Sequence, residues 1–236
     1  MELLVDPSFS PGSVLCEEES RHCVKVMRHR EGDTVYVTDG QGQRFECRLV
    51  KADARGCLLD VVTTEVVPTF HHMLHMAVAP TKNIDRFEWF VEKAVEIGVC
   101  QITPIICDHS ERITLRLDRL ERVATAAAKQ SLKCHLPNIG EPISCAKLIE
   151  QATEQQRFIL HCEEEAKRHL CQACASGLST LVLIGPEGDF STREIELAKE
   201  HGFEACTLGE QRLRTETAAM VATNIVNLAE QLMPKI

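Results

Sequence analysis

Residues 181–216 constrain the fold most, because they contain the same succession twice: a short apolar run, a loop with glycine, and a helical pattern. In the first occurrence, the apolar run 181–184 ends in the turn Gly-Pro-Glu-Gly at 185–188, and a helical pattern follows. Ser191 and Glu194 form an S-x-x-E capping box, in which each side chain bonds an orphan amide at the start of a helix. The pattern predicts a strand, a turn and a helix.

The second occurrence follows Gly202, where the first helix is predicted to end. A short run at 205–208 reaches Gly209, a polar loop covers 210–214, and a long apolar helix begins near Thr215. A strand–helix–strand unit of this length implies parallel strands, whose carboxyl ends lie at one edge of the sheet. Because open α/β sheets bind ligands at that edge, the two loops predict a shared binding pocket.

In the rest of the chain, the pattern of predicted secondary structure changes near Pro68. Before it, alternating segments at 34–38 and 44–50 flank Asp-Gly-Gln-Gly, which predicts a β-hairpin in a small, mostly β barrel. After it, strands alternate with helices, which predicts a mainly parallel sheet. The helix expected at 84–97 has one apolar stripe and ends at Gly98.

The two loops carry the most specific motifs. Residues 183–191 read L-I-G-P-E-G-D-F-S, and residues 208–218 read L-G-E-Q-R-L-R-T-E-T-A. This pairing resembles the RsmE family, the 16S ribosomal RNA uridine-N3 methyltransferases of the SPOUT superfamily, whose hallmarks read L-I-G-P-E-G-G-F-S and L-G-x-R-I-L-R-T-E-T-A. The resemblance covers nearly the whole chain. This sequence departs from the family pattern at Asp189, at Gln211 and Arg212, and at 129–133, which leaves the local loop shape and the phosphate-contacting arginine open.

The resemblance implies a two-domain organisation. Residues 1–69 would form a PUA-like β-barrel that binds RNA, and residues 70–236 a SPOUT α/β-knot domain, a trefoil-knotted mainly parallel sheet. It also implies a homodimer, the cofactor S-adenosylmethionine, and methylation of N3 of a decoding-region uridine in the 16S rRNA of an assembled small subunit. The final helix is apolar on much of its circumference, which a subunit interface or deep burial within one chain would explain equally well. The residues that it implies for cofactor binding are Leu160, Ile184, Gly185, Pro186, Glu187, Gly188, Leu208, Gly209, Leu213, Thr215 and Ala218.

The expected reaction requires a proton acceptor and a stabiliser of negative charge, because uracil N3 carries a proton at neutral pH. Arg214 is the candidate stabiliser, since its planar fork of donors suits a uracil carbonyl or a phosphate. A salt bridge from Arg214 to Glu216 or Glu187 is the structural alternative. Glu187 is a candidate base, or else orients ligand amines, and Glu216 is favoured at a helix N-terminus without any catalytic duty.

The formal net charge of −9 argues against a protein that coats nucleic acid indiscriminately. Despite this negative net charge, the chain has two locally basic stretches, one within 21–30 and one within 112–133. Each alone is explained by a solvated face. In a chain that resembles RNA-modifying enzymes, they predict contact with phosphate by Arg21, Lys25, Arg28, Arg30, Arg112 and Lys133.

Other classes of protein are disfavoured. There is no G-x-G-x-x-G after the first strand of the α/β region, and no Walker A, G-x-S-x-G or H-E-x-x-H motif. The apolar runs are too short to span a bilayer and the N-terminus lacks a signal-peptide pattern, so we expect a cytoplasmic protein. The scattered cysteines predict buried free thiols, and we expect no metal at His169, Cys171 and Cys174 or at the histidines 71, 72 and 75.

Two alternatives to the uridine-N3 enzyme stay open. A non-catalytic RNA-binding or ribosome-assembly module can retain the fold, although the intact loops favour an enzyme. A SPOUT methyltransferase with a different RNA target is the second alternative, because related enzymes with similar pockets modify ribose hydroxyls or guanine nitrogen.

Overall fold

The structure is a computed structural model that describes residues 2–68 and 74–232. The chain forms two compact units, one made of Met1–Thr69 with Thr125–Leu136 and the other of Phe70–Ala124 with Pro137–Ile236. The domain boundary predicted after residue 69 lies outside the described residues and stays a prediction.

The first unit contains a four-stranded sheet in the order β1-β2-β3-β4. The predicted hairpin is confirmed: β2 and β3 pair antiparallel, with Val37 opposite Phe45. Phe45 and Val37 are buried in one apolar core, and Val14 bridges to Leu58 outside the named strands. A short α-helix, α1, continues directly as a π-helix, η1. The elements are β1 (Leu3–Val5), α1 (Glu17–Arg21), η1 (His22–Val26), β2 (Thr34–Thr38), β3 (Gln43–Lys51) and β4 (Leu58–Val66).

The second unit contains a parallel sheet in the order β10-β12-β9-β11-β5-β6-β7, with β8 also paired to β6. Its strands are β5 (Leu74–Val78), β6 (Gln101–Ile106), β7 (Asn138–Ile139), β8 (Ile143–Ser144), β9 (Gln156–Leu160), β10 (Arg168–His169), β11 (Thr180–Ile184) and β12 (Glu204–Thr207). Its helices are α2 (Ile84–Ile97), α4 (Cys145–Gln151), α5 (Leu170–Ala173), α6 (Thr192–Glu200) and α7 (Thr215–Leu232), and α3 (Leu117–Gln130) begins in it.

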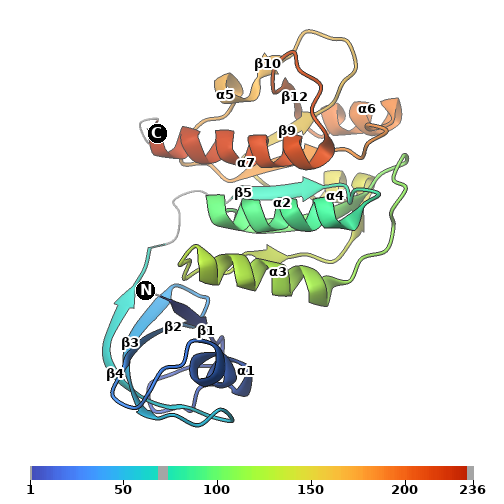
Figure 1. Cartoon of the computed structure of the whole chain (residues 1–236). Helices are drawn as coiled ribbons and strands as arrows, with labels where there is room; N and C mark the ends of the chain where they lie inside the picture. The colour runs from blue at the N-terminus through green and yellow to red at the C-terminus, as the bar shows by residue number, and fades with distance from the viewer. Residues whose placement is uncertain (1, 69–73, 233–236) are drawn as a thin grey trace. The chain divides into compact units, whose positions relative to one another are not determined.

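Helices cover both faces of this sheet (Figure 1). On one face, side chains of α4 and α6 such as Ile149 and Ile195 pack with Leu181 and Leu183 of β11 in one buried cluster. On the other, α2 and α7 lie side by side, and α7 packs on β5 and β11. With both faces buried, the central strands are continuous apolar runs rather than alternating ones.

The sequence located the main elements of this unit. Ser191 caps α6 and exchanges both bonds of the predicted capping box with Glu194, and α2 ends at Gly98, which has φ 122°. The predicted α/β region with a mainly parallel sheet is confirmed; the trefoil knot stays a prediction. The two-residue strands β7, β8 and β10 and the four-residue helix α5 were not predicted, because so few residues carry no periodicity. None of the described helices is long and apolar enough to cross a bilayer.

Candidate active site

The carboxyl ends of β9, β11 and β12 lie at one edge of the sheet, because these strands are parallel and β9 pairs with both of the others. The loops that follow them therefore emerge together. We name residues 185–190, after β11, the first loop and residues 208–214, after β12, the second loop. This is the arrangement that the sequence predicted for a shared binding pocket.

The first loop is tied to neighbouring segments by its acidic side chains. Glu187 Oε1 accepts a hydrogen bond from the backbone N–H of Lys82 at 2.9 Å, and Asp189 Oδ2 accepts one from the N–H of Cys162 at 2.7 Å. His109 Nδ1 lies 3.1 Å from the carbonyl oxygens of Gly188 and Asp189. Asp189 has φ 63°, a conformation that aspartate tolerates better than most residues. Asp189 thus adopts a left-handed backbone conformation in this turn and anchors the loop through its carboxylate.

The second loop has few internal bonds. Gly209, at φ 116°, donates its N–H to Thr207 Oγ1 at 3.1 Å. Arg212 and Arg214 are exposed, and their side chains form no hydrogen bond or ion pair with any residue that the structure describes. The structural alternative for Arg214, a salt bridge to Glu216 or Glu187, is therefore not formed. Its guanidinium is available to a ligand.

Two adjoining cavities, of about 460 and 480 Å³, are lined by these loops. They share Leu160, Cys162, Arg212, Leu213 and Ala218, and we treat them together as the cleft. Every residue predicted to bind the cofactor lines it, as do Glu187 and Arg214. The structure therefore brings together the whole predicted set, whose individual roles stay predictions.

The cleft also contains residues that the sequence did not indicate. Arg86 of α2 lines it and places Nε 3.9 Å from Oε1 of Glu216, which lies in the first turn of α7. Cys162 and Lys167 follow β9, and burial raises the pKa of the Cys162 thiol. Cys162 and Lys167 stand outside any motif, so only the sheet order, which places β9 between β11 and β12, could have indicated them.

The basic residues predicted to bind RNA differ in their surroundings. In the first unit, Arg21 pairs with Glu17 at 2.7 Å, whereas Lys25 and Arg28 have no side-chain partner among the described residues. Arg30 is exposed beside Asp33, which accepts the Arg30 backbone N–H. Lys133 is half-buried, and burial lowers the pKa of its ammonium group.

The remaining predicted RNA contact, Arg112, lies in the second unit. Its guanidinium donates to the carbonyl oxygens of Thr81 and Lys82, with Nη2 2.8 Å from the Lys82 oxygen. These acceptors are neutral, so the charge of Arg112 is not compensated by a carboxylate among the described residues.

Clusters with metal-ligand chemistry have other partners. Of the described residues, Cys107, Cys145 and Glu194 come close enough to share an ion. Both oxygens of Glu194, however, accept backbone N–H groups, from Asp108 at 3.1 Å and Ser191 at 2.9 Å. Hydrogen bonding with Cys145 and burial raise the pKa of Cys107.

Two of the other histidines considered as ligands, His75 and His169, have hydrogen-bond partners within the protein. His75 bonds Glu154 and Thr103, and His169 Nδ1 accepts the N–H of Cys171 at the start of α5. Histidines 71 and 72 lie outside the described residues. None of the twelve cysteines forms a disulfide, as predicted, and eight of them are buried; Cys162 and Cys171 are exposed, contrary to the prediction of buried thiols.

Comparison with known proteins defines the class. A family model described as an RNA methyltransferase domain matches residues 69–227, and one described as an RNA methyltransferase PUA domain matches residues 15–62. The chain is thus an RNA methyltransferase in which a PUA domain precedes the catalytic fold.

The relatives are more specific. Ribosomal RNA small subunit methyltransferase E of Mesomycoplasma hyopneumoniae is 32% identical over 202 residues, covering 84% of this chain and 86% of its own. The crystal structure of a probable rRNA-methyltransferase from Porphyromonas gingivalis has a TM-score of 0.92 at 36% identity, covering 98% of this chain and 99% of that one. Ribosomal RNA small subunit methyltransferase E from Neisseria gonorrhoeae, bound to S-adenosyl methionine, has a TM-score of 0.78 at 26% identity, with 98% of both chains covered. This chain belongs to the ribosomal RNA small subunit methyltransferase E family, as its loop motifs indicated.

Proposed function

We propose that this chain uses S-adenosylmethionine to methylate N3 of a decoding-region uridine in 16S rRNA. The observation that carries the proposal is the cleft, in which both family motifs meet at one edge of a parallel sheet. Action on an assembled small ribosomal subunit in the cytoplasm is part of the same proposal.

The residues of the cleft fit the cofactor. Apolar side chains of Leu160, Ile184 and Leu213 offer a wall for adenine, and the turn at Gly185 lets backbone groups come close to it. Glu187 and Asp189 lie in the same cavity, where carboxylates favour a cationic ligand. When bound, S-adenosylmethionine supplies an electrophilic methyl group.

The exposed guanidinium of Arg214 supports its role as the stabiliser of charge. Loss of the uracil N3 proton places negative charge on O2 and O4, and a guanidinium donating to either oxygen lowers the energy of that state. Glu187 has one oxygen committed to the N–H of Lys82. Its Oε2 is left to accept the N3 proton or to orient a ligand amine, the two roles that the sequence left open.

The barrel domain is proposed to position the RNA. Arg21, Lys25, Arg28 and Arg30 lie within or next to α1 and η1 of the first unit, and Lys25 and Arg28 carry charges without a side-chain partner among the described residues. A protein with a net charge of −9 needs such localised positive charge to approach phosphate.

A homodimer built partly on α7 is proposed as well. Ala219, Ala222 and Val226 of this helix are buried within the chain itself, whereas Leu228 is 40% exposed and Leu232 78% exposed. The apolar circumference is therefore covered on one side only. A second copy would bury the rest in an isologous contact.

Mass-spectrometric mapping of small-subunit RNA tests the reaction. Unmodified small subunits are incubated with the protein and S-adenosylmethionine, and the expected product is a single uridine methylated at N3. Methylation at another position would identify a different RNA target. No methylation, together with a thermal shift on adding S-adenosylhomocysteine, would favour the non-catalytic assembly module; at a hundred times the dissociation constant the expected stabilisation is about 2.7 kcal/mol.

A further inference from the structure

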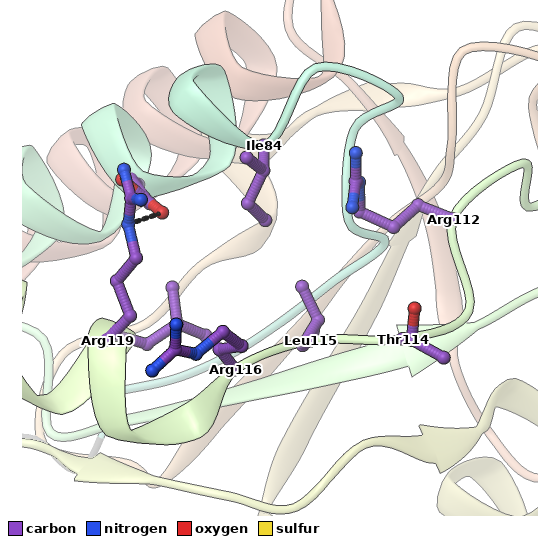
Figure 2. Close-up of a pocket in the computed structure, with 8 residues that line it drawn as sticks. Ile84, Arg112, Thr114, Leu115, Arg116 and Arg119 are labelled. Carbon is purple, nitrogen blue, oxygen red and sulfur yellow. Dashed lines mark hydrogen bonds and ion pairs between the residues drawn. The ribbon is translucent and has the colours of Figure 1, made fainter.

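A second cavity, of about 250 Å³, lies apart from the cleft, beside the N-terminus of α2 and the segment that leads into α3 (Figure 2). We name it the arginine pocket. Ile84, Leu115 and Leu120 give it apolar walls, and Arg112, Arg116 and Arg119 surround it. The one carboxylate in its lining, Glu88, is paired with Arg119. All of its lining residues belong to the second unit.

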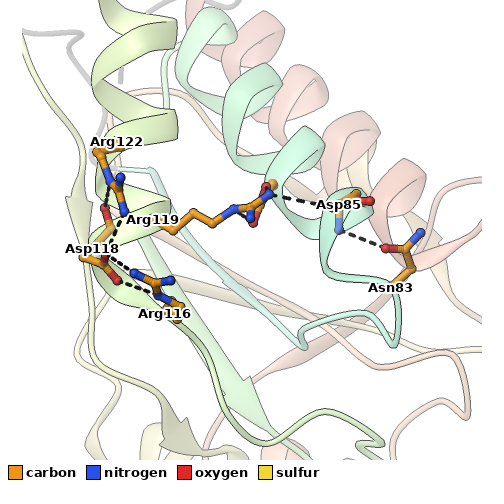
Figure 3. A network of polar contacts seen from close by, with 7 residues as sticks. Asn83, Asp85, Arg116, Asp118, Arg119 and Arg122 are labelled. Atoms are coloured by element: carbon orange, nitrogen blue, oxygen red, sulfur yellow. Dashed lines mark hydrogen bonds and ion pairs between the residues drawn. The ribbon is translucent and has the colours of Figure 1, made fainter.

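The arginines of this pocket differ in how their charge is compensated (Figure 3). Arg119 Nη2 donates to Glu88 Oε2 at 2.8 Å. Arg116 Nη2 lies 2.8 Å from Asp118 Oδ2, and the same oxygen also accepts a hydrogen bond from Arg122 Nη2 at 2.7 Å. One carboxylate thus serves two guanidiniums.

This sharing leaves Arg116 able to change partner. Arg116 also donates from Nε to Asp118 Oδ1 at 3.3 Å, but its side chain is 74% exposed, so solvent screens this ion pair and its net contribution to stability is small. If Arg116 turns to an anion in the pocket, Asp118 keeps Arg122 as its partner. Together with the uncompensated Arg112, the pocket can therefore present two guanidiniums to one ligand.

A hydrogen-bonded path connects the arginine pocket to the cleft through one residue. Arg112 donates to the carbonyl oxygen of Lys82, and the N–H of Lys82 donates to Glu187 Oε1 at 2.9 Å. Glu187 lines the cleft. A ligand held by Arg112 is therefore placed next to the segment that orients Glu187.

We propose that the arginine pocket binds the phosphate and ribose of an RNA nucleotide that adjoins the target base. The guanidinium forks match a phosphodiester, and the apolar walls accept the face of a ribose or base. The N-terminus of α3 at Leu117 adds a partial positive charge beside the pocket. This inference rests on the proposed function and adds a substrate contact to it.

The test compares two arginines that differ in one respect. Arg116 and Arg122 share Asp118 and are similarly exposed, at 74% and 69%, but only Arg116 lines the pocket. Binding of a fluorescent ten-nucleotide oligouridylate is measured by anisotropy at several salt concentrations with S-adenosylhomocysteine present. We expect Arg116→Ala to raise the dissociation constant about tenfold and to reduce the logarithmic salt slope by about 0.7.

Arg122→Ala should change affinity less than about twofold, because an exposed charge outside the pocket contributes little. Arg116→Lys should recover part of the loss, since it keeps the charge but not the fork. Equal losses in Arg116→Ala and Arg122→Ala, an unaffected Arg116→Ala, or a parent protein that does not bind the oligonucleotide would overturn the proposal. If the contrast between the two arginines appears but the mapped product is not N3-methyluridine, the proposed reaction fails and the pocket assignment stands.

Discussion

The two loops of the cleft leave strands on either side of β9, but they are held in different ways. In the first loop, the carboxylates of Glu187 and Asp189 each accept a backbone N–H from another segment, and Ser191 caps the helix that follows. In the second loop, Arg212 and Arg214 are exposed and their side chains bond none of the described residues. The first loop is thus fixed by hydrogen bonds to other segments of its domain. The arginine side chains of the second loop have no such bonds to the described residues.

This difference indicates a division of labour within the cleft. A loop fixed in advance can hold a cofactor without an ordering cost, because its conformation is already the binding one. Arginines without partners can instead move to meet charge on a substrate, although ordering each of them costs about 0.5–1.5 kcal/mol of side-chain entropy. We therefore expect changes in the first loop to act on stability and cofactor affinity, and changes in the second to act on turnover.

The largest expected effect is on turnover in Arg214→Ala. Removing a donor to charge that develops in the reaction typically lowers the rate about 10²- to 10³-fold, or about 2.7–4 kcal/mol. Single-turnover methylation measures the rate, and calorimetry with S-adenosylhomocysteine should show an unchanged affinity.

Arg212→Ala is the matched control, because it removes the same charge from the same loop. We expect its rate to fall less than about tenfold, since no role in the reaction is assigned to it. If Arg212→Ala is the slower variant, the stabilising arginine has been misassigned. That outcome would indicate that Arg212, which departs from the family pattern, has taken over the stabilising role.

The next largest effect is expected at Asp189, the anchor of the first loop. Asp189→Ala loses the charge-assisted bond to the Cys162 N–H and places alanine at a φ of 63°, so we expect the free energy of unfolding to fall by about 2 kcal/mol. Urea denaturation measures the change. Asp189→Gly removes the same bond, but glycine adopts a positive φ without strain. This variant should therefore lose less stability than Asp189→Ala. A glycine variant as stable as the parent would show that the hydrogen bonds of the Asp189 carboxylate contribute no more than glycine gains at this positive φ.

The sequence predicted what depends on local pattern. The cap at Ser191, the end of α2 at Gly98 and the strand at 181–184 all follow from short-range rules, and the structure has them where expected. The pairing of the two loops also followed, because parallel strands fix which ends lie together. The predicted cofactor residues therefore line one cleft.

Interactions between distant residues could not be predicted in this way. The bond from Lys82 to Glu187 joins residues 105 positions apart, and Arg119 meets Glu88 across 31 positions. The sequence shows acids such as Asp118 within the basic stretch at 112–133, but it does not show partners on other elements. In the structure, acids of α2 compensate it as well, because Asp85 and Glu88 lie beside Arg119.

A smaller effect is expected at Gly209, which begins the second loop with a φ of 116°. An added Cβ would meet no atom within 4 Å, so Gly209→Ala tests backbone conformation alone. We expect a loss of about 1–2 kcal/mol in stability and weaker binding of S-adenosylhomocysteine. Gly177→Ala is the control, since Gly177 has φ 78°, equally open surroundings and no place in the cleft. It should lose similar stability and bind the ligand normally.

The smallest effect is expected at Ser191, which directly follows the first loop and caps α6. Its Oγ accepts the N–H of Glu194 and donates to Asp108 Oδ2 at 2.6 Å. Ser191→Ala should lower the free energy of unfolding by about 1 kcal/mol, the usual effect of losing a helix cap. Ser144→Ala removes the cap of α4, which lies outside the cleft, and should have a similar effect on stability. If the first loop is held in its binding conformation by this cap, only Ser191→Ala will also weaken S-adenosylhomocysteine binding in calorimetry; equal ligand affinities in the two variants would show that the loop keeps its shape without the cap.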